Sequence, residues 1–72
     1  MGNKSIELSG GKKVEMREPK VRDMRIVSKY TDEVEKEINL TANLTGLTTN
    51  EIDEMSLGDY NLLQKGLKDF LS

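Results

Sequence analysis

The sequence contains no cysteine and no histidine among its 72 residues. Without cysteine there are no disulfide bonds and no thiolate nucleophile, and without either residue there is no zinc finger. Histidine is also the side chain that most often serves as a general base near neutral pH. Most enzyme classes lose their usual machinery in this way, so we predict a protein that is not an enzyme and uses no cofactor.

Long apolar segments are missing as well. No run approaches the roughly 18 apolar residues of a membrane-spanning helix, and the first residues lead into no apolar stretch of a secretory signal. We therefore expect no membrane contact and a cytoplasmic location. The length fits one domain, residues 1–72, whose thin core buries only roughly 60% of the surface that the unfolded chain exposes. Such a core leaves room for a partner or a homo-oligomer to complete it.

Charge is present but unevenly distributed. Residues 1–30 carry eight Lys and Arg against four Asp and Glu, a net +4, whereas residues 31–72 carry three against nine, a net −6. A molecule with this dipole can stack head to tail or present one signed face to a partner. The alternative is that the charges only solvate two ends of a small domain.

The alternation of apolar and polar residues from Ile6 to Met16 predicts a β-hairpin over about residues 5–17. A two-residue loop at its centre would place Glu7 opposite Val14 and mix the two faces. A three-residue loop Ser9-Gly10-Gly11, with Gly11 in the left-handed conformation, instead pairs Ile6 with Val14 on one face. We predict the second register.

Helical segments follow the hairpin. Pro19 ends the strand and suits the first turn of a helix whose apolar stripe is Val21, Met24 and Val27. The helices are expected at about residues 20–29, 33–45, 49–55 and 57–71, the third being one short turn. Together with the hairpin they predict a small α+β domain.

The ends of the later helices carry capping residues. Thr31 or Asp32 can cap the second helix, and Gly46 is placed to end it. Thr48 followed by Glu51 forms a capping box, and Ser56 followed by Asp59 has the same form. These local features fix the boundaries of the predicted helices.

No motif for chemistry is intact. The sequence around Gly10-Gly11-Lys12 fails the phosphate-loop pattern twice and is explained by a hairpin turn. The carboxylates of residues 32–37 and 51–54 lack the spacing of a calcium loop and are typical of helix starts. We therefore predict no metal site.

Basic residues near the first helix offer an alternative function, contact with a nucleic-acid backbone. Glu18 and Asp23 interrupt this patch, and the chain as a whole is acidic, so nucleic acid is not the partner that we favour. The basic residues are Arg17, Lys20, Arg22, Arg25 and Lys29.

Apolar side chains are more numerous than one buried face of each helix requires. In the second helix, Val34, Ile38 and Ala42 form one stripe and Leu40 and Leu44 form another. A domain this small has little core against which to bury both, although singly exposed leucines are normal. The predicted partner-binding residues are Ile26, Tyr30, Leu40, Leu44 and Leu62.

Three short motifs resemble one family. They are Arg17-Glu18-Pro19 with Asp23 after the hairpin, Leu44-Thr45-Gly46-Leu47-Thr48, and Leu57-Gly58-Asp59-Tyr60 before the last helix. In this order and spacing they are similar to the small tail assembly chaperones of contractile-tailed bacteriophages and their prophages. The likeness runs from about Val14 to Leu71, and the hairpin departs from it, because the approach to the first strand is short.

The resemblance implies a non-enzymatic assembly role. Such proteins coat the long helical tape-measure protein during tail morphogenesis, keep it soluble and recruit tail tube subunits. The resemblance therefore implies tape-measure and tail tube proteins as partners, the host bacterial cytoplasm as the location, and absence from the mature virion. A small prophage-encoded DNA-binding or regulatory protein is the alternative.

Overall fold

The computed structural model describes residues 3–71, which fold as a two-stranded antiparallel hairpin followed by helices. This arrangement confirms the predicted α+β class. The elements are β1 (Lys4–Glu7), a 3-10 turn (Ser9–Gly11), β2 (Lys13–Met16), α1 (Val21–Val27), α2 (Glu33–Thr45), α3 (Thr49–Glu54) and α4 (Leu57–Leu71).

The hairpin has the predicted register, with Ile6 opposite Val14. Its loop is closed by the backbone N–H of Leu8, which donates to the carbonyl oxygen of Lys12 at 2.7 Å. Gly10 and Gly11 both adopt positive φ, at 78° and 81°. Only glycine takes this conformation without steric cost, so the Gly-Gly pair determines the turn.

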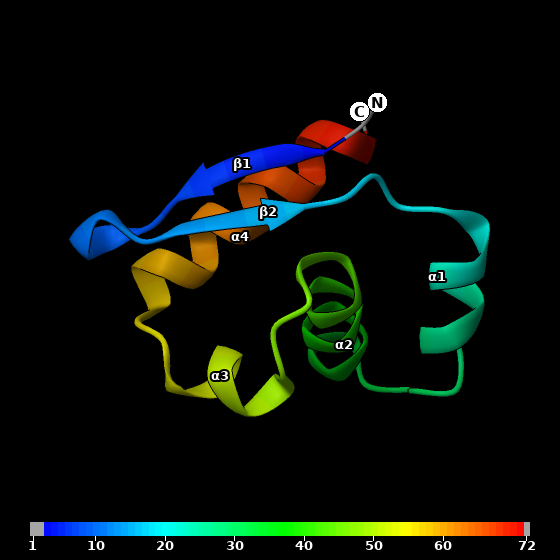
Figure 1. The fold of residues 1–72 in the computed structure, drawn as a ribbon. Helices are drawn as coiled ribbons and strands as arrows, with labels where there is room; N and C mark the ends of the chain where they lie inside the picture. Colours follow the sequence, from blue (N-terminus) through cyan, green and yellow to red (C-terminus); the bar gives the residue numbers. More distant parts are fainter. Residues whose placement is uncertain (1–2, 72) are drawn as a thin grey trace.

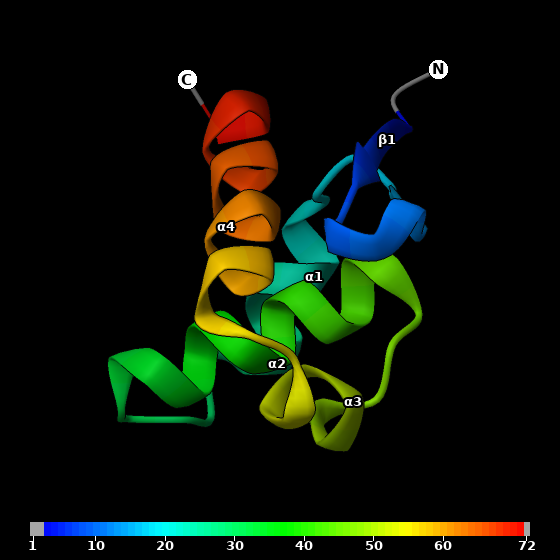
Figure 2. The ribbon, with the colours of Figure 1, turned by 90° about the vertical axis from the view of Figure 1, so that its left-hand side faces the viewer.

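The hairpin lies along α4, and α2 crosses beneath both (Figure 1). The turned view shows α4 beside the hairpin and α2 running across the lower end of α4 (Figure 2). Strand β1 packs against α4 and strand β2 against α2. Since side chains alternate along a strand, one face of the hairpin supplies four apolar residues to the core. The buried cluster is Ile6, Leu8, Val14, Met16, Leu44, Leu63 and Leu67.

The predicted caps of α2 and α3 are present. Asp32 accepts a hydrogen bond from the backbone N–H of Glu35, and Gly46 ends α2 in the left-handed conformation. Thr48 and Glu51 bond each other's backbone N–H groups at 3.0 and 2.9 Å, which completes the capping box. These bonds satisfy backbone groups that a helix end otherwise leaves free.

The start of α4 differs from a capping box. Ser56 accepts a hydrogen bond from the backbone N–H of Asp59, but the carboxylate of Asp59 accepts bonds from the N–H and hydroxyl of Ser9, both at 2.9 Å. These hydrogen bonds hold the pKa of Asp59 below its usual value. The carboxylate thus ties the hairpin turn to the first turn of α4.

Helix α1 is rotated relative to the sequence prediction. Val27 is buried, but Val21 and Met24, expected in the same buried stripe, are exposed. The residue that turns inward with Val27 is Asp23, one turn earlier on the same face. The prediction for Val21 and Met24 was therefore wrong, because a buried carboxylate and not an apolar stripe sets the orientation of α1.

Gly66 permits the close approach of β1 to α4. A Cβ atom at this position would lie 2.5 Å from Cδ1 and 3.3 Å from Cγ1 of Ile6, and 3.6 Å from Cδ of Lys4. Gly66 is itself buried, although a glycine inside a helix costs about 1 kcal/mol relative to alanine. Glycine occurs at this position because β1 packs too closely on α4 for a larger residue.

This contact predicts coupling between Gly66→Ala and Ile6→Val, since the second substitution removes the Cδ1 atom that the new methyl group would meet. We expect Gly66→Ala to be more favourable by about 1 kcal/mol in the Ile6→Val background than in the wild type. Urea unfolding of the four variants of this double-mutant cycle measures the difference. Additive effects would contradict the close approach.

Candidate functional site

Leu44, one of the predicted partner-binding residues, belongs to the core. It is 2% exposed and lies in the buried cluster with the hairpin and α4. Its carbonyl oxygen accepts a hydrogen bond from the backbone N–H of Arg17 at 2.9 Å. The expectation that Leu44 faces a partner was wrong, because α2 turns this stripe toward the hairpin.

The other four predicted residues lie on separate parts of the surface. Ile26 on α1 is 52% exposed and Leu62 on α4 is 41% exposed. Tyr30 is half-buried, with the Nζ of Lys29 5.3 Å from its ring centroid. Leu40 is half-buried and packs on the edge of the core. The structure does not bring these side chains together into one site.

An apolar groove of about 290 Å³ lies between α2, α3 and α4 instead. Val34, which is 59% exposed, and Leu57, which is 74% exposed, are the most exposed of its apolar side chains. We call it the α2–α4 groove, and it is lined by Val34, Ile38, Ile52, Asp53, Met55, Leu57 and Tyr60.

The sequence predicts the two apolar stripes of α2, but the structure divides them differently between groove and core. Val34 and Ile38 face the groove, whereas Leu44 faces the core. The position of Val34 in the first turn of α2, beyond the end of the short core, is the sequence feature that indicates its exposure. Leu57 occupies the equivalent position at the start of α4.

A second groove of about 330 Å³ adjoins the first, and Val34 lines both. Tyr60 from the first groove donates a hydrogen bond from its hydroxyl group to the carboxylate of Glu37 from the second. Burial and this hydrogen bond raise the pKa of Tyr60 well above its usual value, so the phenol stays protonated. The second groove is lined by Val27, Glu33, Val34, Lys36, Glu37, Leu40 and Leu67.

Carboxylates lie beside the apolar side chains of both grooves. Asp53 lines the first, and Glu33 and Glu37 line the second. Lys36 lies 3.9 Å from Glu33 and offsets part of this charge. Apolar side chains framed by negative charge suit an occupant with an apolar face and basic flanks.

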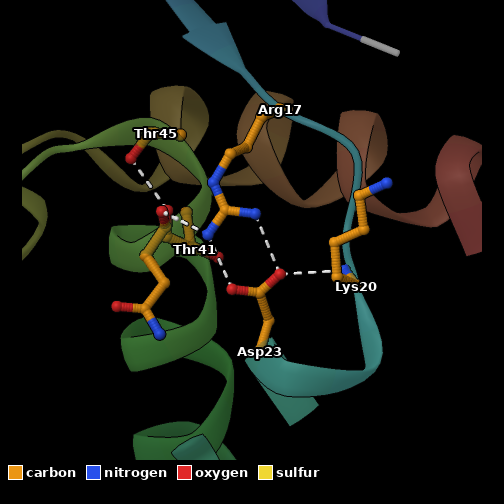
Figure 3. Close-up of polar contacts among 6 residues, drawn as sticks. Arg17, Lys20, Asp23, Thr41 and Thr45 are labelled. Carbon is orange, nitrogen blue, oxygen red and sulfur yellow. Dashed lines mark hydrogen bonds and ion pairs between the residues drawn. The ribbon is translucent and has the colours of Figure 1, made fainter. Parts of the chain in front are cut away.

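A polar cluster lies near the C-terminal end of α2, where Arg17 reaches from the segment after β2 to Asp23 at the start of α1 (Figure 3). Two guanidinium nitrogens bond the two carboxylate oxygens at 2.9 and 2.6 Å, and the backbone N–H of Lys20 donates to Asp23 at 2.8 Å. Asp23 is only 1% exposed. The hydrogen bonds from Arg17 are the main reason that the pKa of Asp23 lies below its usual value.

The same arginine reaches α2. Its guanidinium donates to the carbonyl oxygen of Asn43 at 3.3 Å, in addition to the backbone bond to Leu44. Beside it on α2, Thr45 donates to the carbonyl oxygen of Thr41, whose hydroxyl accepts a hydrogen bond from Gln64 of α4 at 2.8 Å. Within residues 3–71, no buried side-chain nitrogen or oxygen lacks a hydrogen-bond partner. The cluster therefore joins elements and leaves no polar group for a ligand.

Two of the five basic residues predicted as a nucleic-acid contact are occupied by other residues of the protein. The guanidinium of Arg17 is occupied by Asp23, and the ammonium group of Lys29 lies over the ring of Tyr30. Of the basic patch, Lys20, Arg22 and Arg25 remain as exposed side chains on or next to α1. No feature of the described residues favours a phosphate backbone over another acidic partner.

In the part of the chain that the structure describes, no group of three or more acidic side chains is placed to hold a metal ion. No described helix is both long and apolar enough to cross a membrane.

Open apolar grooves beside carboxylates, on a domain whose described buried polar groups are satisfied internally, are typical of a surface that binds another protein. Residues 8–72 match the family model of the phage tail assembly chaperone proteins E, or 41 or 14. The chain belongs to this family. The match begins at Leu8, so β1 lies outside it. Neither a curated protein nor a solved structure matches the chain.

The Arg17–Asp23 pair predicts a specific dependence of stability on pH. A carboxylate whose pKa is lowered on folding stabilises the fold above its unfolded pKa of about 3.9, and this stabilisation is lost as pH falls through the lower, folded value. We expect Asp23→Asn to reduce the free energy of unfolding at pH 7 by about 2 kcal/mol, since it leaves Arg17 without its counter-charge.

The difference between Asp23→Asn and the wild type should shrink at acid pH, where the wild-type carboxylate is also neutral. Urea unfolding at neutral pH and in strong acid measures it. Glu54→Gln, which neutralises an exposed carboxylate of α3, is the control and should change stability by less than about 0.5 kcal/mol. A difference that stays constant with pH would contradict the assigned role of the pair.

Proposed function

We propose that this protein binds a helical segment of the tape-measure protein during tail morphogenesis and keeps that protein soluble. Membership of the tail assembly chaperone family supports a role in tail assembly. The observation that carries the proposal is the α2–α4 groove, where Val34 and Leu57 present apolar side chains to solvent. The role is non-enzymatic.

The groove suits a helix better than an extended strand. Its walls are helices α2, α3 and α4, and its apolar side chains point into one trough. An amphipathic helix binds such a trough by placing residues spaced three and four apart along its floor. Met55, which lines the groove, has a flexible side chain that adapts to different partners.

A small groove gives weak binding of each copy. Many copies along one tape-measure chain would still hold it, because each bound copy raises the effective concentration of the next. Weak single contacts also allow replacement by tail tube subunits, which we propose as the second partner. The work would then be done in the host bacterial cytoplasm, and the protein would be absent from the mature virion.

The groove can be tested with Val34→Asp and Leu57→Asp. Both residues lie in the first turn of their helices, where the helix dipole stabilises a negative charge, so both variants should fold. We expect co-expression with the tape-measure protein of the same phage to leave that protein soluble with the wild type and aggregated with either variant. Soluble yield after centrifugation is the measurement.

Asn50→Asp is the matched control, because it adds the same charge in the first turn of α3 and lies outside the α2–α4 groove. It should protect the tape-measure protein as well as the wild type does. Protection by both groove variants would place the contact elsewhere on the protein. Failure of the wild type to protect would refute the proposed function itself.

A further inference from the structure

Helix α1 shows the solvent a face that is both apolar and basic. Val21, Met24 and Ile26 are exposed, whereas the side of α1 that packs on α2 carries Asp23 and Val27. Exposed apolar side chains gathered on a short helix mark a contact surface more often than isolated ones do.

The basic residues form a ridge between these apolar side chains. At about 100° per residue, Arg22 and Arg25 lie on the outer side of α1, with Val21 and Met24 on one flank and Ile26 on the other. Arg22, Arg25 and Ile26 line a shallow hollow together. The guanidinium groups of Arg22 and Arg25 make no hydrogen bond or ion pair within residues 3–71. We call Val21, Arg22, Met24, Arg25 and Ile26 the α1 face.

The α2–α4 groove has the complementary character on the same molecule. Its floor is apolar, Asp53 lies at its rim, and Glu33 and Glu37 continue the negative charge into the adjoining groove. The groove borders α3, which lies at the opposite end of the molecule from α1, with α2 between them (Figure 1). One chain therefore cannot fill its own groove with its own α1 face.

We propose that the α1 face of one copy docks in the α2–α4 groove of the next copy. The two surfaces differ, so the contact is heterologous, and repeating it builds an open chain of copies instead of a closed dimer. Charge complementarity selects the pairing: arginines meet carboxylates, whereas two α1 faces or two grooves would repel each other. The −6 and +4 charges of the two parts of the sequence act in the same direction.

The contact is weak, because α1 contributes only seven residues. Its buried area falls at the low end of specific interfaces, where association is transient. Since the groove is also the proposed tape-measure site, a tape-measure helix would displace the neighbouring copy. The self-association needs no tape-measure protein, so it can be measured on the full chain alone.

Sedimentation velocity of the full chain tests the proposal. Between about 20 µM and about 1 mM we expect the weight-average sedimentation coefficient to rise about 1.5-fold or more, as a transient interface requires. The rise should shrink when salt increases from about 0.05 M to about 0.5 M, because exposed charges are screened. A sedimentation coefficient independent of concentration at low salt would overturn the proposal.

Charge reversal identifies the two surfaces. Arg22→Glu with Arg25→Glu should abolish self-association, and so should Glu33→Lys with Asp53→Lys. Mixed in equal amounts, the two double variants should associate again, since one retains an intact groove and the other an intact α1 face. The reversed charges of their two remaining surfaces also complement each other, so alternating chains can form as well as heterodimers. Association of either double variant alone, or no association of the mixture while both remain folded by circular dichroism, would overturn the proposal.

Lys65→Glu with Lys68→Glu on α4 is the control. It makes the same change in net charge as the α1 double variant but alters exposed residues outside both surfaces. It should associate as the wild type does, and equal loss would overturn the assignment of the contact to α1. A wild type that self-associates but fails to protect the tape-measure protein would refute the proposed function and leave this inference standing.

Discussion

The ion pair between Arg17 and Asp23 is the interaction on which the arrangement of the helices depends. It lies where β2, α1 and α2 meet, and the same arginine also bonds carbonyl oxygens near the end of α2. A domain of this size has a thin apolar core, so a polar contact between three elements has a large share in orienting them. Removing a carboxylate from water is costly, so the pair contributes less to net stability than its short distances suggest. Its main effect is positional, because it determines which side of α1 faces inward and hence which apolar residues face the solvent.

How far the sequence predicts this structure depends on the range of each interaction. The hairpin register, the αL glycine of α2 and the capping box of α3 follow from residues a few positions apart, and each was predicted correctly. The burial of Leu44 and the exposure of Val21 and Met24 were not, because the side of each helix that faces inward depends on where the hairpin and α4 lie. A carboxylate in the first turn of a helix, such as Asp23, is usually explained by the helix dipole. Its partner Arg17 stands six residues earlier across a non-helical segment, and no helical or strand periodicity marks that contact.

The α1 face and the α2–α4 groove both exist because the core is too small to bury all the apolar residues. Leu57 and Val34 stand in the first turns of their helices, past the edge of the buried cluster, and α1 gives up two apolar residues to solvent so that a carboxylate can face inward. Apolar area that a larger domain would bury is therefore left on two faces, and the opposite charges of the two parts of the chain give those faces different sign.

The attachment of α1 also divides the molecule into parts of unequal stability. Val27 is the only buried apolar residue of this helix, and Asp23 supplies the rest of its attachment. The hairpin, the second half of α2 and α4 share the main cluster without it. Opening of α1 alone therefore needs less free energy than global unfolding, so its amide protons should exchange with solvent through local excursions that leave the core intact. In such an excursion Val27 leaves the groove beside Leu40 and Leu67, and the fold gains a larger apolar surface while its hairpin register and core remain unchanged.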